Sequence, residues 1–309
     1  MRQPLSRAPS HKEEKMIKVI ASDLDGTLLN DGHALDQRTV EAIRSAQERG
    51  IRFIVVTGRN FTQTMEQLEG FDITCDFVLA SGAEVRDERR RLVSRVTMDM
   101  GVCEEICGEL EKWPVSVVFS TDTYDYRIGT PQEVERSLIL QAQNFHVDMS
   151  EEEIRADPLF LRMSQNTRAS ASFEELKNAN PVVYKIFLFS CDVVMLKRLS
   201  AVLSKDRRIA VAASFETNLE ITDVRAQKGP VLKAYIESLG YGMDEVMVFG
   251  DSTNDASMLS MDFGATVAME NAMPEVKEMA KYVTKSNQEA GVAYAIERLL
   301  EDCTFSSSG

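Results

Sequence analysis

The 309-residue sequence has few of the residues on which disulfide frameworks and histidine-based metal sites depend. Its five cysteines are an odd number without a Cys-x-x-Cys pair, and its three histidines lie far apart. Neither a disulfide framework nor a zinc site is therefore expected, and a reducing cytoplasm is the predicted location. No apolar run approaches the about 20 residues of a membrane-spanning helix, so we expect no membrane association.

Positive charge is also scarce. Lys and Arg number 35 against 49 Asp and Glu, which gives a net charge of -14. This balance opposes attraction to phosphate backbones, so we expect no nucleic-acid partner. Abundant Asp beside few His favours a hard, oxygen-ligated ion such as Mg²⁺. An anionic substrate must therefore meet a local positive field.

The two ends of the chain differ in composition from the rest. Residues 1–15 mix Arg and Lys with Pro, Ser and Glu and lack the apolar stretch of a secretory signal. Residues 304–309 are rich in Ser. We predict a flexible N-terminal arm over 1–15 and a flexible tail over 304–309.

Two stretches alternate between strand and helix patterns, which indicates a parallel sheet with helices on both faces. The predicted strands cover residues 17–21, 51–56, 77–80, 246–249 and 265–268. The predicted helices begin near Asp36 and Phe61 in the first stretch and near 230, Pro274 and 292 in the second. We therefore predict an α/β, Rossmann-like core formed by residues 16–97 and 224–303.

The intervening residues 98–223 have a mixed pattern. Extended pieces are predicted over 115–120, 182–189, 209–213 and 219–222, together with a helix over 193–203. We predict an α+β domain inserted into the core, so that the core is built from two separated segments.

The sequence Asp23-Leu24-Asp25-Gly26-Thr27 directly follows the first predicted strand. The carboxyl ends of parallel strands are where such sheets bind ligands, so both carboxylates are expected to enter one pocket. The alternative is a strand that ends in an ordinary polar turn.

This Asp-x-Asp-Gly-Thr sequence resembles the first motif of the haloacid dehalogenase superfamily. Thr57-Gly58-Arg59, Lys228-Gly229 and residues 250–255 follow in the family's order. Residues 258–284 resemble the Cof-type branch, subfamily IIB, whose members have a C2B-type cap. The resemblance covers residues 16–300 and implies a Rossmann-like core with an inserted α+β cap that determines substrate choice.

The resemblance implies catalysis through an aspartyl-phosphate. Asp23 is the expected nucleophile, and Asp25 the expected general acid that becomes a general base. Crowding by the other acids should favour protonated Asp25, while Mg²⁺ opposes that shift. The predicted metal-binding set consists of Asp23, Asp25, Asp251 and Asp255, with Asp25 contributing its backbone carbonyl and Asp255 acting indirectly.

Four residues are expected to bind or orient the phosphate. Thr57 can donate its hydroxyl, and the backbone at Gly58 can approach closely. Lys228 would neutralise the phosphate and the Asp23 carboxylate, and Asn254 would orient the loop. Taken singly, a capping Thr, a solvated Lys or a surface turn explains each of these residues. One departure is Ser81-Gly82-Ala83, where the family usually has Asn-Gly-Ala.

These residues predict a Mg²⁺-dependent phosphatase, a phosphoric monoester hydrolase, that acts on small phosphorylated metabolites. The resemblance implies sugar phosphates first and cofactor phosphates second. A sugar phosphomutase and a catalytically weak phosphate-ligand sensor are the alternatives, although a sensor has no need of an acid such as Asp25. A monomer or a small homo-oligomer is expected.

Three further features have simpler interpretations. Residues 88–91 predict an exposed hairpin tip rather than a phosphate clamp. Cys103 and Cys107 share a helical face as partly buried thiols. For Tyr124 and Tyr126, substrate contact and ordinary packing are equally open.

Overall fold

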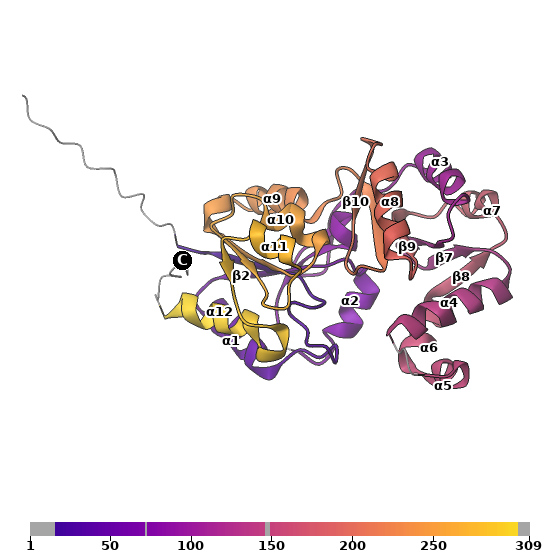
Figure 1. The fold of residues 1–309 in the computed structure, drawn as a ribbon. Coiled ribbons are helices and arrows are strands. Elements are labelled where there is room, and N and C mark those ends of the chain that lie inside the picture. The colour runs from indigo at the N-terminus through magenta and orange to yellow at the C-terminus, as the bar shows by residue number, and fades with distance from the viewer. Residues whose placement is uncertain (1–15, 72, 146–148, 302–309) are drawn as a thin grey trace, which may run out of the picture.

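The computed structural model describes residues 16–71, 73–145 and 149–301, which form two lobes (Figure 1). The predicted arm over 1–15 and the predicted tail over 304–309 lie outside the described residues. We call the lobe with α1, α2 and α9–α12 the core, and the lobe with α3–α8 the cap. None of the described helices combines the length and the apolar character required to span a bilayer.

The core contains an eight-stranded sheet in the order β14-β13-β12-β1-β2-β3-β4-β5. Its strands are β1 (Val19–Ser22), β2 (Arg52–Val56), β3 (Asp76–Leu79), β4 (Glu84–Arg86), β5 (Leu92–Arg95), β12 (Val246–Gly250), β13 (Ala265–Ala268) and β14 (Tyr282–Val283). The first six strands of that order are parallel, and β4 and β5 add an antiparallel hairpin. Because β1 pairs with β12, segments far apart in sequence share one sheet, as predicted.

Helices cover both faces of the core sheet. They are α1 (Gln37–Glu48), α2 (Phe61–Gln67), α9 (Lys228–Ser238), α10 (Ala256–Leu259), α11 (Pro274–Met279) and α12 (Gly291–Leu300). Short 3₁₀ turns occur at η1 (Ala80–Gly82), η2 (Met243–Glu245), η3 (Thr253–Asp255) and η4 (Asn287–Glu289). As predicted, α1 is capped by the Asp36 carboxylate, which accepts a hydrogen bond from the backbone of Arg38. Gly50, at φ +79°, allows the turn into β2.

The cap contains a six-stranded sheet in the order β10-β11-β9-β6-β7-β8. Its strands are β6 (Ser116–Thr121), β7 (Asp125–Ile128), β8 (Thr167–Ser170), β9 (Val183–Phe189), β10 (Ile209–Ala212) and β11 (Asn218–Asp223). Its helices are α3 (Met100–Leu110), α4 (Pro131–Phe145), α5 (Glu151–Ala156), α6 (Pro158–Asn166), α7 (Phe173–Asn178) and α8 (Val193–Leu203). The four predicted extended pieces correspond to β6, β9, β10 and β11. The residues around Tyr124 and Tyr126 indicate β7 only as a possible cap strand, and β8 is not predicted from the sequence.

The two faces of the cap sheet differ in chemistry. One face is apolar, with Phe119, Ile186 and Ile221 in the same buried cluster as residues of α3 and α8. The strand register places four polar residues in a row on the other face: Asp125, Ser120, Lys185 and Thr222. We call these residues the cap-sheet row. Its face is turned toward the core, because Lys185 contacts the core loop after β2.

The interpretations of residues 88–91 and of the two cysteines are confirmed. Residues 88–91 form the exposed turn between β4 and β5. In α3, Cys103 is buried and Cys107 half-buried. Tyr126 packs against the apolar cluster of the cap, and the guanidinium of Arg168 lies 3.8 Å from the centre of the Tyr124 ring. Tyr126 therefore serves packing, whereas Tyr124 is exposed beside Arg168.

Gly229 allows α9 to pack against α10. A Cβ atom at this position would lie 1.9 Å from the carbonyl oxygen of Ser257. Gly229→Ala should lower the free energy of unfolding by at least about 1–3 kcal/mol, because backbone must move. Gly108→Ala in α3 is the matched control, since nothing lies within 4 Å of its added methyl group. That change should stabilise the fold by up to about 1 kcal/mol. Urea titration of both variants measures the difference, and equal effects would contradict the packing argument.

Candidate active site

Three carboxylates meet at the carboxyl ends of adjacent core strands. Asp23 follows β1, Asp251 follows β12, and Asp255 lies in η3. One oxygen from each carboxylate lies within 4.8 Å of the other two. The parallel pairing of β1 with β12 produces this arrangement, and the backbone N–H of Asp23 donates to the carbonyl of Phe249 at 3.0 Å.

Lys228, the first residue of α9, joins this cluster. Its Nζ atom lies 2.6 Å from Asp23 Oδ1, 2.6 Å from Asp255 Oδ1 and 3.2 Å from Asn254 Oδ1. The residue is only 1% exposed. Burial alone would lower the pKa of Lys228, but Asp23 and Asp255 raise it above its usual value. The ammonium therefore stays charged at neutral pH.

Asp23 and Asp251 are both held in an environment that disfavours their charge. Burial raises the pKa of Asp23, and the Asp255 carboxylate raises it further, against the opposing effect of Lys228. Burial and the Asp255 carboxylate also raise the pKa of Asp251 to about 7, although Thr27 donates a 2.7 Å hydrogen bond to it. Among the described residues, no Lys or Arg forms an ion pair with Asp251.

Asp255 holds the loop that follows β12. Its Oδ1 atom accepts from Lys228, and its Oδ2 atom accepts from the backbone N–H groups of Asp251 and Ser252 at 3.0 and 3.2 Å. Both of its oxygens are therefore engaged by protein donors, and the loop is fixed in a shape that presents Asp251 to Asp23.

Asp25 is paired with basic side chains rather than with the other acids. Arg59 donates to both of its oxygens, at 2.7 and 2.6 Å, and His33 Nδ1 lies 3.6 Å away. Burial would raise the pKa of Asp25, but the hydrogen bonds from His33 and Arg59 hold it well below the usual range. The prediction that crowding by acids favours protonated Asp25 is wrong for this arrangement, because its nearest partners, Arg59 and His33, are basic side chains that lower its pKa.

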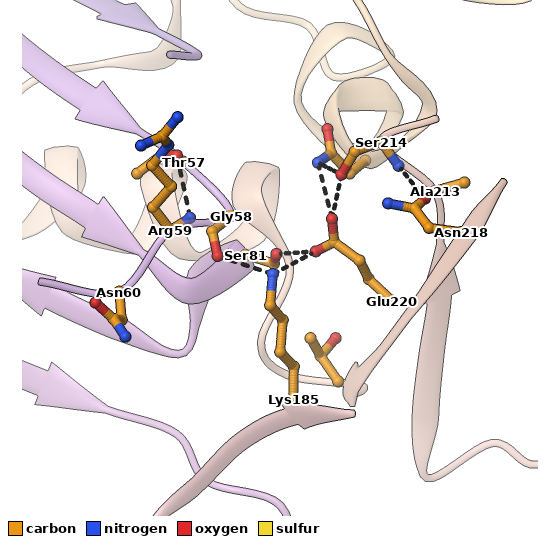
Figure 2. Close-up of polar contacts among 12 residues, drawn as sticks. Thr57, Gly58, Arg59, Asn60, Ser81, Lys185, Ala213, Ser214, Asn218 and Glu220 are labelled. Atoms are coloured by element: carbon orange, nitrogen blue, oxygen red, sulfur yellow. Dashed lines mark hydrogen bonds and ion pairs between the residues drawn. The ribbon is translucent and has the colours of Figure 1, made fainter. Parts of the chain in front are cut away.

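The loop after β2 brings Thr57 and Gly58 beside residues from the cap (Figure 2). Thr57 Oγ1 accepts from the backbone of Arg59 at 3.1 Å, and the Gly58 carbonyl accepts from Lys185 Nζ at 2.8 Å. Lys185 Nζ also lies 3.0 Å from Glu220 Oε2, which accepts from Ser81 Oγ at 2.5 Å. Cap and core therefore meet at this loop.

The structure brings together most of the residues predicted from sequence. Lys228 directly joins Asp23, Asn254 and Asp255, and Asp251 lies beside them. Asp25, Thr57 and Gly58 lie on the loops after the paired strands β1 and β2, with Asp25 linked to that second loop through Arg59.

Four residues of the site were missed or left without a role: His33, Arg59, Lys185 and Glu220. The position of Arg59 at the end of Thr57-Gly58-Arg59 was one available signal. A second signal was the single charged residue, Lys185, inside the otherwise apolar strand β9; β11 also contains Asp223 and gives no such signal for Glu220.

Comparison with known proteins gives the family. A family model described as haloacid dehalogenase-like hydrolase matches residues 20–296. The chain is 32% identical over 289 residues to the 5-amino-6-(5-phospho-D-ribitylamino)uracil phosphatase YwtE of Bacillus subtilis, across 92% of this chain and 98% of that protein. It is 29% identical over 285 residues to YcsE, a phosphatase of the same name and organism, across 92% and 96% of the two chains.

A solved structure of a haloacid dehalogenase-like hydrolase from B. subtilis has the same fold. The TM-score is 0.79 at 29% sequence identity, and the match covers 92% of this chain and 100% of that one. The chain therefore belongs to the haloacid dehalogenase-like hydrolase family. It is a phosphatase, a phosphoric monoester hydrolase, that acts on small phosphorylated substrates, and this confirms the predicted class and fold.

The buried Lys228 ammonium should be required for stability as well as for activity. Lys228→Met leaves Asp23 and Asp255 without a counter-charge, and removal of one member of a buried ion pair costs about 3–5 kcal/mol. Lys233→Met on the same helix is the control, because this side chain is 42% exposed and should contribute less than about 0.5 kcal/mol. Chemical denaturation without added metal measures the free energy of unfolding of each variant. If both variants were as stable as the parent, Lys228 would not be the buried counter-charge of Asp23 and Asp255.

Proposed function

We propose that this phosphatase is Mg²⁺-dependent and transfers the phosphoryl group to Asp23. Phosphorylated sugars and sugar alcohols are the first substrates to test, and cofactor phosphates the second. The single observation that supports this proposal best is the cluster of three carboxylates around the buried Lys228. A carboxylate nucleophile beside other acids requires cations to offset their repulsion of an anionic substrate.

The residues present fit a hard divalent cation. Asp251 is a partly buried carboxylate without an ion-pair partner among the described residues, and it lies beside Asp23. Asp23, Asp251 and the backbone carbonyl of Asp25 would hold Mg²⁺ directly, and Asp255 would support them from behind because both of its oxygens are engaged. Bound Mg²⁺ would supply charge neutralisation at the phosphoryl oxygens.

The other catalytic roles are assigned to side chains and backbone groups of the protein. Asp23 attacks phosphorus, and Lys228 neutralises negative charge on Asp23 and the phosphoryl group. Thr57 and the backbone of Gly58 bind phosphoryl oxygens, and Asn254 orients Lys228 through its Oδ1 atom. Asp25 protonates the leaving oxygen and then activates water. Arg59 must release Asp25 in that step, because the bidentate pair keeps its pKa low.

The cap selects the substrate in this proposal. Residues 16–97 and 224–303 would fix the reaction, and residues 98–223 would contact the leaving group. The name of the similar enzyme YwtE specifies a substrate with a phosphorylated ribityl chain. A phosphorylated sugar alcohol is therefore a suitable first test for this chain.

Phosphate release should be lost in EDTA and restored by Mg²⁺, because the carboxylates would otherwise repel the substrate. The measurement is phosphate release from p-nitrophenyl phosphate before and after chelation. Restoration by Ca²⁺ to the same rate would contradict a requirement for small, octahedral Mg²⁺. Undiminished turnover by the chelated enzyme would exclude the metal role altogether.

Asp23 and Asp25 should be separable by substitution. Asp23→Asn removes the nucleophile, so both turnover and the covalent intermediate should be lost. Asp25→Asn should reduce turnover by at least about 100-fold, the usual contribution of general acid–base catalysis, while phosphate-ligand binding is retained. Beryllium fluoride, which mimics a phosphoryl group, should attach to Asp23 in the Asp25 variant. Attachment at another carboxylate would show that Asp23 is not the nucleophile.

A further inference from the structure

The face of the cap sheet that is turned toward the core has polar residues beside the candidate site. Across neighbouring strands, Ser120 pairs with Asp125 and with Lys185, and Lys185 pairs with Thr222. These four residues are the cap-sheet row. Helices α3 and α8 pack against the opposite, apolar face, whereas α4 is hydrogen-bonded to Arg127 and Ser116 on the same face as the row. A substrate under the cap would meet the end of the row at Lys185, which contacts the core.

Lys185 is held at the core end of the row. Its ammonium has three N–H donors, of which two meet acceptors among the described residues, the Gly58 carbonyl at 2.8 Å and Glu220 Oε2 at 3.0 Å. The side chain is 10% exposed. One donor is therefore available beside the loop that the proposed function assigns to phosphate binding (Figure 2).

Glu220 fixes the position of that ammonium. Its carboxylate accepts from Ser81, Ser214 and Lys185, and Asn254 Nδ2 lies 3.4 Å away. Burial would raise the pKa of Glu220, but Lys185 and the hydroxyl donors lower it to about 2. The carboxylate is thus charged at neutral pH and acts as a positioning residue for Lys185.

Asp125 supplies an acceptor farther along the row. Its Oδ1 atom and Arg127 Nε are the two buried side-chain atoms without a hydrogen-bond partner in the described part of the chain. The other donors of Arg127 bind Ser116, Ser137 and Gln141, which ties α4 to the sheet. Asp125 lies on the same strand face as Arg127, where burial lowers the pKa of the guanidinium and the charge of Asp125 raises it. The Asp125 Oδ1 atom is nevertheless left without a hydrogen-bond donor among the described residues.

We propose that Lys185 and Asp125 form the subsite for the leaving group and select a polyhydroxy chain. This inference rests on the proposed function. Lys185 donates to an oxygen near the phosphate ester, and Asp125 accepts from a hydroxyl farther along the chain. The two residues are separated by two strand steps, about 10 Å, which suits a chain of pentitol length. A hydroxyl group both donates and accepts, so it satisfies both residues.

The test compares ribitol 5-phosphate with n-pentyl phosphate, which has the same number of carbons but no hydroxyl groups. The parent enzyme with Mg²⁺ should have a much higher kcat/KM for ribitol 5-phosphate. Lys185→Met and Asp125→Ala should each lower the ratio of the two kcat/KM values by about 10- to 100-fold, the effect of one hydrogen bond to a charged group. In Asp125→Ala, the kcat/KM for n-pentyl phosphate should change by less than about threefold. In Lys185→Met it should fall, because Lys185 contacts the phosphate-binding loop, but by less than the kcat/KM for ribitol 5-phosphate.

Two conservative variants and one control complete the design. Lys185→Arg keeps a donor and Asp125→Asn keeps an acceptor, so each should retain part of the preference for ribitol 5-phosphate over n-pentyl phosphate. These variants also serve as the test if a truncated variant fails to fold. Lys197→Met in α8 changes an exposed lysine on the far side of the sheet and should leave the ratio unaltered.

The outcomes separate this inference from the proposed function. If the parent releases no phosphate from p-nitrophenyl phosphate, the proposed function fails. If it hydrolyses that ester but does not prefer ribitol 5-phosphate to n-pentyl phosphate, the subsite is wrong and the proposed function stands. The subsite is also wrong if the truncated variants lose activity toward both test substrates by the same factor.

Discussion

The buried Lys228 ammonium is the interaction on which the site depends. It connects Asp23, which follows β1, with Asp255 in η3, although these residues are distant in sequence. Gly229 lets the start of α9 approach closely enough for this contact. Two carboxylates can therefore lie side by side in a buried place, because the cation that offsets their repulsion is part of the fold. Lys228 offsets part of the negative charge of the three-carboxylate cluster, and in the proposed function Mg²⁺ would offset the rest before an anionic substrate binds.

The local positive field is supplied by three residues of a chain whose net charge is -14. Lys228, Arg59 and Lys185 are each paired with a carboxylate: Asp23, Asp25 and Glu220 respectively. Because each cation is paired in the structure, a phosphoryl group that binds as proposed would have to compete with a carboxylate for it. Under that proposal, selectivity would depend on which of these pairs a substrate can replace, and of the three only the Lys185–Glu220 pair belongs to the cap.

The sequence predicted the core better than the cap for a physical reason. Asp23, Thr57 and Asp251 each follow a parallel strand, so a local motif and one general rule about strand ends place them together. Lys185 and Glu220 become neighbours only through the register of β9 with β11, and they reach Gly58 only through the contact of cap with core. Neither feature has a local signature. The pairing of Arg59 with Asp25 likewise depends on how two loops meet.

Ser81 belongs to a motif of the core and contacts Glu220 of the cap, the partner of Lys185. It adopts the left-handed conformation, with φ 60°, which Ser tolerates less readily than the Asn usual in the family. Gly82, at φ +102°, follows so closely against Gln227 that a Cβ atom would lie 2.8 Å from its backbone. The turn at residues 80–82 is thus formed with Ser81, although Asn would suit the left-handed conformation better. Ser81 donates a hydrogen bond from its hydroxyl to Glu220, the cap carboxylate that also pairs with Lys185. The departure from the family motif is therefore matched by an interaction with the cap.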